Sequence, residues 1–458
     1  MVTMASCTVS SGEQGRSFTN WAATFTCKPD LYFEPTTTEE IIQILKEARR
    51  LSKRVKVCGY GHSPSDIACT DGYMIDMRRF NQLIDIDEQN CTVKVQGGYL
   101  LTDLIDDVLE PQGMAMQNIA AISDISIAGM ICTGTHGTGA NHGILSTQVL
   151  EIELITAAGE EVTCSHTENT DLFRAACCSL GALGVITAVT FQCEPAFKLH
   201  QRQWPGTLDE VLDNLDEHIT SSEHFKFSWM PHTESVSMCR MDRTKEPVTD
   251  VSSWFWNIFV GYHCFQFAYW MSSIFPSIVG FINRTLFYLL FSKPLQRINI
   301  SRKVFAFDGF IPHYVTDWAI PSEQTATVLR ELRTWFRENP NEAAHFPLEV
   351  RFCQSDNIML SPAYGRDTCF VNILVYRPYG KIIPHAKFWA AYENIVKRAG
   401  GRPHWAKAHQ ETGKELVDMY PDFGKFCEIR RKMDPQGMFL NAYLERVFCM
   451  DSGVSVDS

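Results

Sequence analysis

Several signals that would assign a chain to a common class are missing from this sequence. It has 16 cysteines in 458 residues, but no two of them form a C-x-x-C pair, so their spacing gives no zinc or dithiol motif. No lysine- and arginine-rich run offsets its formal net charge of -12, and a negatively charged protein repels a phosphate backbone. We therefore expect no nucleic-acid partner, and cysteines that are mostly buried free thiols.

Recognisable targeting signals are also missing from both ends. The first twenty residues contain neither a cationic start nor an apolar run, and we expect no cleavable signal peptide. The final residues, SGVSVDS, match no retention, peroxisomal or lipidation signal.

The length and composition are those of a folded protein with more than one domain. The chain is about three times as long as a typical domain of roughly 150 residues. Up to about Pro195 helical and strand-like stretches alternate, beginning with a capping box at Thr37 to Glu40. Beyond Lys198 runs of strands are separated by helices, which favours an antiparallel sheet covered by helices on one face. We predict an α+β fold with two domains, 25–196 and 197–400, an N-terminal segment 1–24 and a C-terminal segment 401–458.

Two glycine-rich segments are the first candidates for a ligand site. In VCGYGHSPSD, residues 57–66, Gly59 and Gly61 permit positive φ angles, so that successive N–H groups can line a phosphate. The dinucleotide fingerprint G-x-G-x-x-G is not met, because Pro64 occupies the third glycine position. A tight turn with a buried histidine is the structural alternative.

The second segment, residues 125–145, contains five glycines and three threonines, which suits a backbone wrapped around a polyanionic or planar ligand. A long surface loop is the alternative. His136 and His142 lie in it, but no carboxylate or cysteine joins them at ligand spacing. We therefore predict no metal site.

Two shorter motifs carry charged side chains. In PLEVRF, residues 347–352, Glu349 and Arg351 are two apart and project from the same face of a strand. Such a pair is usually a surface contact. With His404 and Lys407 of GRPHWAKAH it would instead form a compact set of acid, base and cation.

In this order the motifs resemble the vanillyl-alcohol-oxidase-type flavoproteins, and within them the aldonolactone oxidases. The resemblance covers nearly the whole chain. Its strings are NWA, PTTTEEIIQIL, GHSPSDIACTDG, GTHGTGANHGILSTQVL, WMPHTESVS, YRPYGK, GRPHWAKAH and DPQGMFLNAYLERVF.

The resemblance implies an FAD-binding domain at 25–196, a substrate or cap domain at 197–400, and a C-terminal segment that returns to the flavin. It implies that FAD is bound covalently through the ring of His62. The other residues implied to contact FAD are Val57, Cys58, Gly59, Tyr60, Gly61, Ser63, Ala121, Ser126, Gly129, Thr133, Gly134, Thr135, His136 and either Val185 or Ile186.

The resemblance also implies a reaction. A sugar lactone is oxidised at C2 and the 2-keto lactone tautomerises to ascorbate, while dioxygen becomes hydrogen peroxide. Glu349, Arg351, His404 and Lys407 lie where the family has its substrate-binding and catalytic groups. Arg351 and Lys407 suit the stabilisation of negative charge, and either Glu349 or His404 would orient or deprotonate the hydroxyl.

Three alternatives remain open. The family controls oxygen access with a small residue, for which we expect glycine in an oxidase, and this chain has Ala120. A dehydrogenase with another electron acceptor is therefore one alternative, and an alditol oxidase with the same flavin site is another. An inactive membrane protein that keeps the fold is the third, and the presence of His62, Glu349, Arg351 and Lys407 argues against it.

The last unusual feature is an apolar, aromatic segment at 251–291. Residues 251–283 contain no Asp, Glu, Lys or Arg. Polar residues, Pro276 and Gly280 interrupt the segment, which favours helices lying in the bilayer surface over a spanning helix or an aromatic core. We expect attachment to the endoplasmic reticulum (microsomal) membrane. Three glycosylation sequons, at Asn90, Asn283 and Asn299, would matter only for a luminal chain.

Overall fold

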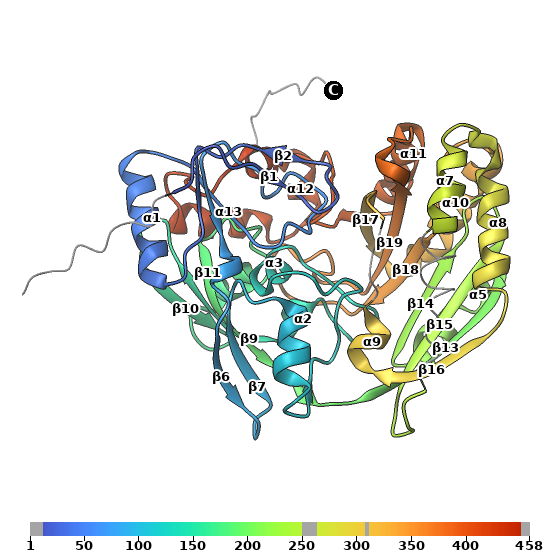
Figure 1. Cartoon of the computed structure of the whole chain (residues 1–458), viewed down its shortest axis with the longest axis horizontal. Coiled ribbons are helices and arrows are strands. Elements are labelled where there is room, and N and C mark those ends of the chain that lie inside the picture. The colour runs from blue at the N-terminus through green and yellow to red at the C-terminus, as the bar shows by residue number, and fades with distance from the viewer. Residues whose placement is uncertain (1–11, 250–262, 307–310, 450–458) are drawn as a thin grey trace, which may run out of the picture.

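The computed structural model describes residues 12–249, 263–306 and 311–449, and its chain forms two halves (Figure 1). The N-terminal half holds a three-stranded and a five-stranded sheet besides short strand pairs, and the other half is built around one large sheet. The sequence therefore predicted the α+β class and the two-part organisation correctly. The boundaries at 196 and 400 stay predictions.

The N-terminal half begins with a parallel β-α-β unit. Its three strands have the order β3 (Leu31–Phe33), β5 (Tyr73–Asp76), β4 (Val55–Cys58). Helix α1 (Thr38–Arg50) connects β3 to β4, and the predicted capping box at Thr37 and Glu40 is present at its start. Its buried residues recur at helical spacing and pack against this small sheet.

A five-stranded antiparallel sheet completes this half, in the order β10-β9-β11-β7-β6. The strands are β6 (Leu83–Asp87), β7 (Thr92–Gln96), β9 (Val149–Ile155), β10 (Glu161–Ser165) and β11 (Val185–Gln192). The helices are η1 (Met77–Arg79), α2 (Leu101–Asp103), which continues as a π-helix η2 (Leu104–Leu109), α3 (Ile127–Cys132), η3 (Leu145–Gln148) and α4 (Thr170–Ala176). Two short strand pairs are β1 (Phe18–Thr19) with β2 (Thr26–Cys27), and β8 (Met114–Ala115) with β12 (Glu194–Pro195).

The second half contains an eight-stranded antiparallel sheet, in the order β16-β13-β15-β14-β18-β19-β17-β20. The strands are β13 (Lys198–Thr207), β14 (His224–Trp229), β15 (Ser235–Thr244), β16 (Leu295–Ile300), β17 (His313–Pro321), β18 (Leu348–Cys353), β19 (Thr368–Tyr376) and β20 (Arg402–Pro403). The helices are α5 (Leu208–Asp213), α6 (Leu215–Thr220), α7 (Phe265–Ser272), η5 (Pro276–Ile278), α8 (Val279–Leu290), α9 (Ser301–Phe305), η6 (Ser322–Gln324), α10 (Thr325–Glu338), η7 (Pro378–Gly380) and α11 (Ala386–Arg398).

The two faces of this sheet have different roles. Along β18, Leu348, Val350 and Phe352 join a core that includes buried residues of α5, α10 and α11. Glu349 and Arg351 alternate with them and line a cavity on the opposite face. The predicted arrangement, an antiparallel sheet covered by helices on one face, is therefore correct.

The C-terminal segment returns to the N-terminal half, where α12 and α13 appear in red in Figure 1. Its helices are α12 (Gly413–Met419), α13 (Phe423–Met433) and α14 (Ala442–Phe448). Their apolar residues, together with Trp405, share one core cluster with the five-stranded sheet. This return brings the GRPHWAKAH motif to the junction of the two halves.

The described part of the aromatic segment forms two short helices, α7 and α8, at the outer end of the second half (Figure 1). Among the described residues, no helix is both long and apolar enough to cross a membrane. Asn283 is fully buried and its Nδ2 donates to the Pro231 and Ala344 carbonyls, so this folded state cannot carry a glycan there. Residues 251–262, which hold the most aromatic part, lie outside the described residues.

Candidate functional site

One cavity of about 670 Å³ is lined by both halves of the chain. Pockets for small molecules and cofactors commonly measure about 300–1,000 Å³. Its wall includes the loop after β4, helix α3, strands β14, β18 and β19, and the segment after β20. The four motifs that the sequence analysis selected thus meet around one space.

Almost all of the sequence-predicted site residues line this cavity. They are Val57, Cys58, Gly59, Tyr60, Gly61, His62, Ser63, Ala121, Ser126, Gly129, Thr133, Thr135, His136, Ile186, Glu349, Arg351, His404 and Lys407. Gly134 does not line it: its φ is +65°, and a Cβ there would meet Pro362 and Cys178 instead. Of the two residues proposed for the adenine end of FAD, Ile186 lines the cavity and Val185 does not.

The loop after β4 approaches the start of helix α3 very closely. A Cβ on Gly59 would lie 2.2 Å from the Ser126 hydroxyl oxygen, which only glycine can tolerate. Ser126 is the N-cap of α3 and its hydroxyl accepts from the Gly129 N–H at 3.3 Å. The two glycine-rich segments therefore form one continuous wall of backbone.

His62 lies at the end of this wall under an aromatic cover. Trp21 stacks on its ring at a centroid distance of 5.4 Å and an angle of 18°. The buried Nδ1 atom of His62 has no hydrogen-bond partner among the described residues. Burial lowers the pKa of His62, which favours the neutral ring with a free nitrogen lone pair.

The cover over His62 is tied to the second half of the chain. The backbone N–H of Trp21 donates to the Gly61 carbonyl at 2.8 Å. Arg377, just after β19, donates to the carbonyls of Ala22 and Ala23 at 2.7 and 3.0 Å. The NWA motif thus acts as a strap across residues 57–63, called the flavin loop below because the resemblance implies that they contact FAD, and the sequence alone did not indicate this role.

Lys56 is a cavity residue that sequence reasoning missed. It is 3% exposed, and its Nζ donates to the Leu180 carbonyl at 3.0 Å. Burial lowers its pKa to about 8. A charged residue in the middle of the apolar strand VKVC was the available signal.

Glu349 is held by two cations. Arg351 bonds one of its carboxylate oxygens, and Lys226 Nζ lies 3.0 Å from the other. Burial alone would raise the pKa of Glu349, but Arg351 and Lys226 hold it at about 2. Glu349 is therefore a fixed anion rather than a proton acceptor at neutral pH. Lys226 was missed because strand pairing, not sequence distance, places it opposite Arg351.

His404 is held in one tautomer. The Ala406 N–H donates to its Nδ1 at 3.1 Å, so Nδ1 carries the lone pair. Burial lowers the pKa of His404 well below its usual range, and the neutral ring then carries its proton on Nε2. Of the two candidates for the base, Glu349 is ion-paired with two cations and His404 has its Nε2 proton available to donate, and the choice between them stays a prediction.

A buried carboxylate, Asp317 of β17, lies behind His404 and was also missed. Its backbone carbonyl accepts from the His404 N–H at 2.9 Å. One of its carboxylate oxygens lies 3.5 Å from His136 Nε2 and accepts from Asn372 at 3.2 Å. An acid in the apolar run YVTDWAIP was the sequence signal. Burial lowers the pKa of the neighbouring Lys407, and Asp317 opposes that shift.

These observations fit FAD as the group for which the cavity is built. The wall of backbone at residues 57–63 and the capped start of α3 suit a pyrophosphate. The unpartnered Nδ1 of the neutral His62 fits a covalent attachment, and the charged cluster at Glu349 lies in the same cavity. The residues implied to hold FAD and those implied to hold a polar substrate thus line one cavity, and His136 of the first group lies beside His404 of the second, with ring centroids 5.4 Å apart.

Comparison with known proteins first defines the class. The structure is similar to cholesterol oxidase from B. sterolicum, with a TM-score of 0.76 at 16% identity over 94% of this chain and 96% of that one. A solvent-stable cholesterol oxidase gives a TM-score of 0.72 at 16% identity, covering 94% and 97%. The family model "FAD binding domain" matches residues 29–165. The chain is a flavoprotein oxidoreductase with an FAD-binding domain.

The particular family follows from the second half and from whole-length relatives. The family model "D-arabinono-1,4-lactone oxidase" matches residues 189–447. L-gulonolactone oxidases from Scyliorhinus torazame and Bos taurus are each 49% identical over 95% of this chain and 99% of theirs. An L-gulono-1,4-lactone dehydrogenase from Mycobacterium tuberculosis is 33% identical over 94% and 98%. The chain belongs to the aldonolactone oxidase family of FAD-dependent enzymes.

Proposed function

We propose that this chain oxidises L-gulono-1,4-lactone at C2 and uses dioxygen as the electron acceptor. The products are hydrogen peroxide and the 2-keto lactone, which tautomerises to L-ascorbate. The names of the 49% identical relatives support the substrate. The observation that carries the proposal is the cluster of Glu349, Arg351, His404 and Lys407 in the cavity that the FAD loop also lines.

Bound FAD supplies the two-electron oxidant for this reaction. The chain's own residues position the lactone. Arg351 and Lys226 bring positive charge to the buried carboxylate Glu349, and Lys407 adds a cation to the same cavity, so that together they make a polar floor for hydroxyl groups. His404 offers its Nε2–H to an oxygen of the substrate. Negative charge that develops on that oxygen is stabilised by donors already in place.

The covalent attachment of FAD through His62 is part of the proposal. The supporting observations are the neutral, buried ring and its unpartnered Nδ1. A covalent bond would remove the entropy cost of holding the cofactor and fix it relative to Glu349 and Arg351.

Whether oxygen is the electron acceptor depends on how closely the cavity wall at Ala120 limits its access to FAD. A dehydrogenase is therefore the second candidate function. Ala120 is buried and lines the cavity, and one relative is named a dehydrogenase. An alditol oxidase is less favoured, because the relatives that support the family are named for lactones.

Purified protein given the lactone in air is expected to form hydrogen peroxide and ascorbate in equal amounts. Oxygen uptake, peroxide and ascorbate are measured together. If lactone bleaches the yellow colour and only a quinone or cytochrome restores it, the enzyme is a dehydrogenase. Ala120→Gly, which removes one methyl group from the wall, is then expected to restore reaction with oxygen, whereas the matched variant Ala121→Gly is not.

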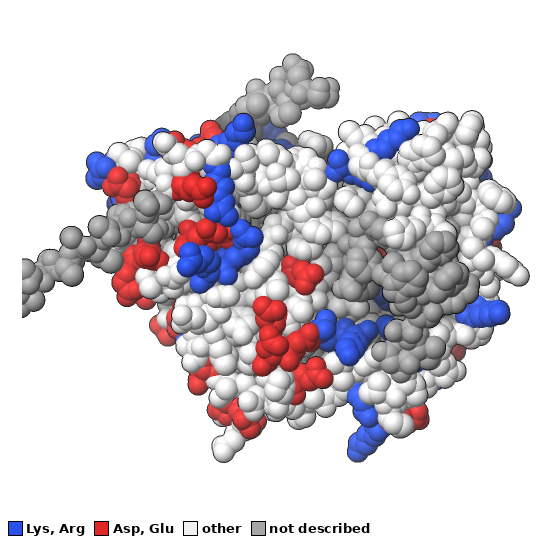
Figure 2. All heavy atoms as spheres, viewed as in Figure 1, with Lys and Arg blue, Asp and Glu red and all other residues white. Residues whose placement is uncertain are grey.

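We also propose that the enzyme attaches to the endoplasmic reticulum membrane through the surface of α7 and α8. One side of the pair packs in a core cluster, with Tyr269 and Val279 fully buried. The other side exposes Phe267, Phe281 and Tyr288 by 54%, 70% and 73%. Figure 2 shows this upper right part of the surface as mostly white. Exposed aromatic side chains on short helices suit the headgroup region of a bilayer.

Wild-type protein is expected to pellet with microsomes, resist high-salt extraction and need detergent for release. Replacing Phe267, Phe281 and Tyr288 by serine is expected to move most of the protein into the salt extract. Serine at Trp254, Phe255, Trp256 and Phe259, which lie outside the described residues, is expected to act in the same direction.

The matched control is the triple variant Leu83→Ser, Ile84→Ser and Val417→Ser, because these exposed apolar residues lie on other elements. It is expected to stay in the membrane fraction. Wild-type protein that is fully soluble without detergent would refute the attachment.

A further inference from the structure

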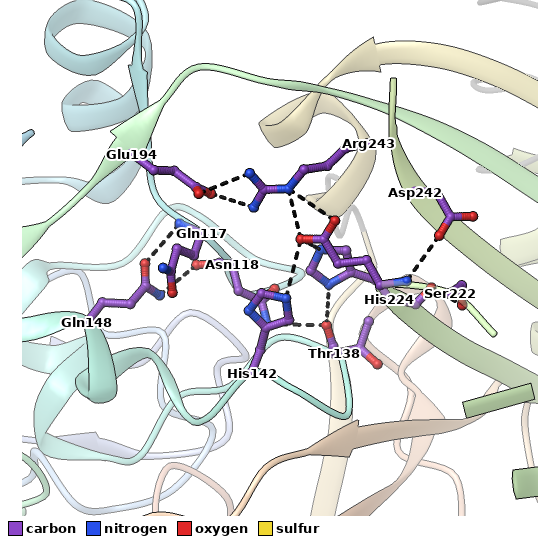
Figure 3. A network of polar contacts seen from close by, with 11 residues as sticks. Gln117, Asn118, Thr138, His142, Gln148, Glu194, Ser222, His224, Asp242 and Arg243 are labelled. Carbon is purple, nitrogen blue, oxygen red and sulfur yellow. Dashed lines mark hydrogen bonds and ion pairs between the residues drawn. The ribbon is translucent and has the colours of Figure 1, made fainter. Parts of the chain in front are cut away.

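Away from the flavin cavity, three metal-ligating side chains converge where the two halves of the chain meet (Figure 3). His142 comes from the loop before η3, and Glu223 and His224 come from the start of β14. One ligand atom from each lies within 4.8 Å of the other two. None of the three lines the cavity.

The hydrogen bonds of His224 fix which of its nitrogens carries the proton. Its Nδ1 lies 2.7 Å from the Thr138 carbonyl oxygen, which also accepts from Asn118 Nδ2 at 3.2 Å. A carbonyl oxygen can only accept, so Nδ1 is protonated. In the neutral ring the other nitrogen, Nε2, then presents its lone pair on the side away from Thr138.

That lone pair faces a carboxylate without a proton between them. His224 is fully buried, and its Nε2 has no hydrogen-bond partner among the described residues. Glu223 Oε1 lies 3.6 Å away, and the same oxygen lies 3.5 Å from His142 Nε2. Both distances are longer than an ordinary hydrogen bond, and a metal cation placed between the three atoms would bind all of them.

The distances and the ligand types agree with zinc. Zinc bonds to histidine nitrogen and carboxylate oxygen measure about 2.0–2.2 Å, which separates neighbouring ligands of a tetrahedron by roughly 3.3–3.5 Å. Two histidines and one glutamate with a water in the fourth position are a known zinc set. The two imidazole rings are stacked, with centroids 4.6 Å apart. The ring of His142 must therefore turn before both histidines can direct a lone pair at the same ion, and His142 is the more exposed of the two.

The surrounding charges leave room for a cation. Arg243 donates to both oxygens of Glu223 at 2.9 and 3.0 Å, and to both oxygens of Glu194 at 2.6 and 3.0 Å. Glu223 and Glu194 carry two negative charges and Arg243 carries one positive charge. The group therefore keeps a net charge of −1, which a cation would offset. Arg243 orients Glu223, and the Thr138 carbonyl orients His224, as outer partners commonly orient the ligands of a metal.

We propose that His142, Glu223 and His224 bind one zinc ion that joins the glycine-rich loop of the FAD half to the sheet of the substrate half. The fourth position is open to solvent through His142 and Glu223, whose side chains are 13% and 26% exposed. The ion is structural: it holds the loop that also carries His136 against β14. Its binding does not depend on the substrate or the acceptor of the enzyme.

The experiment uses the flavin-loaded full chain, freed of metal by a chelator and then given Zn²⁺. The metal content is expected to be about one zinc per chain, and the thermal unfolding temperature is expected to rise with added zinc. X-ray absorption at the zinc edge is expected to show imidazole and oxygen ligands without sulfur.

His142→Ala is expected to lower zinc affinity at least tenfold and to abolish the zinc-dependent rise in unfolding temperature. His224→Phe, which preserves ring volume, is expected to do the same, and His142→Ala keeps the test valid if that buried variant does not fold. The matched control is His200→Ala, whose ring contacts Gln296 on a neighbouring strand. No zinc uptake, sulfur ligands, or unchanged affinity in His142→Ala would each overturn the proposal.

Discussion

Arg351→Met is expected to lower kcat by about 10²–10³-fold with a much smaller change in KM, as removal of a preorganised donor typically does. Arg351 bonds Glu349 in the cavity and cannot lose its proton, so its charge is available whenever negative charge develops on the substrate. Stopped-flow bleaching of the flavin by the lactone, together with steady-state kinetics, separates the two parameters.

Arg351→Lys is the matched control because it keeps a positive charge without the planar fork of donors. It is expected to recover part of kcat. An unchanged flavin spectrum in both variants would show that the cavity is intact. If Arg351→Met raises KM and leaves kcat unchanged, Arg351 only binds the lactone. Unchanged kinetics would refute its place in the site.

His62→Ala is expected to convert covalent flavin into flavin that acid precipitation releases completely into the supernatant. In the wild-type protein the yellow colour should remain with the precipitate and with a peptide that contains residue 62. The variant should still fold, because the His62 ring packs against Trp21 at the cavity wall rather than within a core cluster. Its turnover should fall strongly, since the cofactor is no longer fixed relative to Arg351.

His136→Ala and His142→Ala serve as controls, because both histidines lie in the other glycine-rich segment. Each is expected to keep the flavin covalently attached. Flavin found on a peptide containing residue 136 or 142 would move the attachment to that histidine.

Short sequence patterns correctly predicted features that depend only on residues close together in the chain. The capping box at Thr37 and the projection of Glu349 and Arg351 from one face of a strand are both confirmed. Ser322 precedes the helical pattern TATVLRELRTWF and fits an N-cap, but a short η6 turn intervenes and the residue at the N-cap of α10 is Gln324. A serine that fits the cap pattern cannot reveal an extra turn.

The rest of the site depends on pairing between distant strands. Lys226 reaches Glu349 because β14 pairs with β18, 123 positions further along the chain. Asp317 reaches His136 through β17, and Glu223 reaches His142 across the two halves. The expectation of no metal ligand near His142 rested on sequence spacing alone, and the fold brings a carboxylate and a second histidine to it.

The strap over His62 has a consequence for the moment at which the site is completed. Arg377 and Ala22, which it joins, are separated by 355 positions. At about 5–20 residues per second, a ribosome needs roughly 20–70 s between the synthesis of one and that of the other. The strap therefore lacks its Arg377 anchor until about four-fifths of the polypeptide has been made. The cavity also takes wall residues as late as His404 and Lys407, so the complete site and its strap are expected to form only after most of the polypeptide has been made.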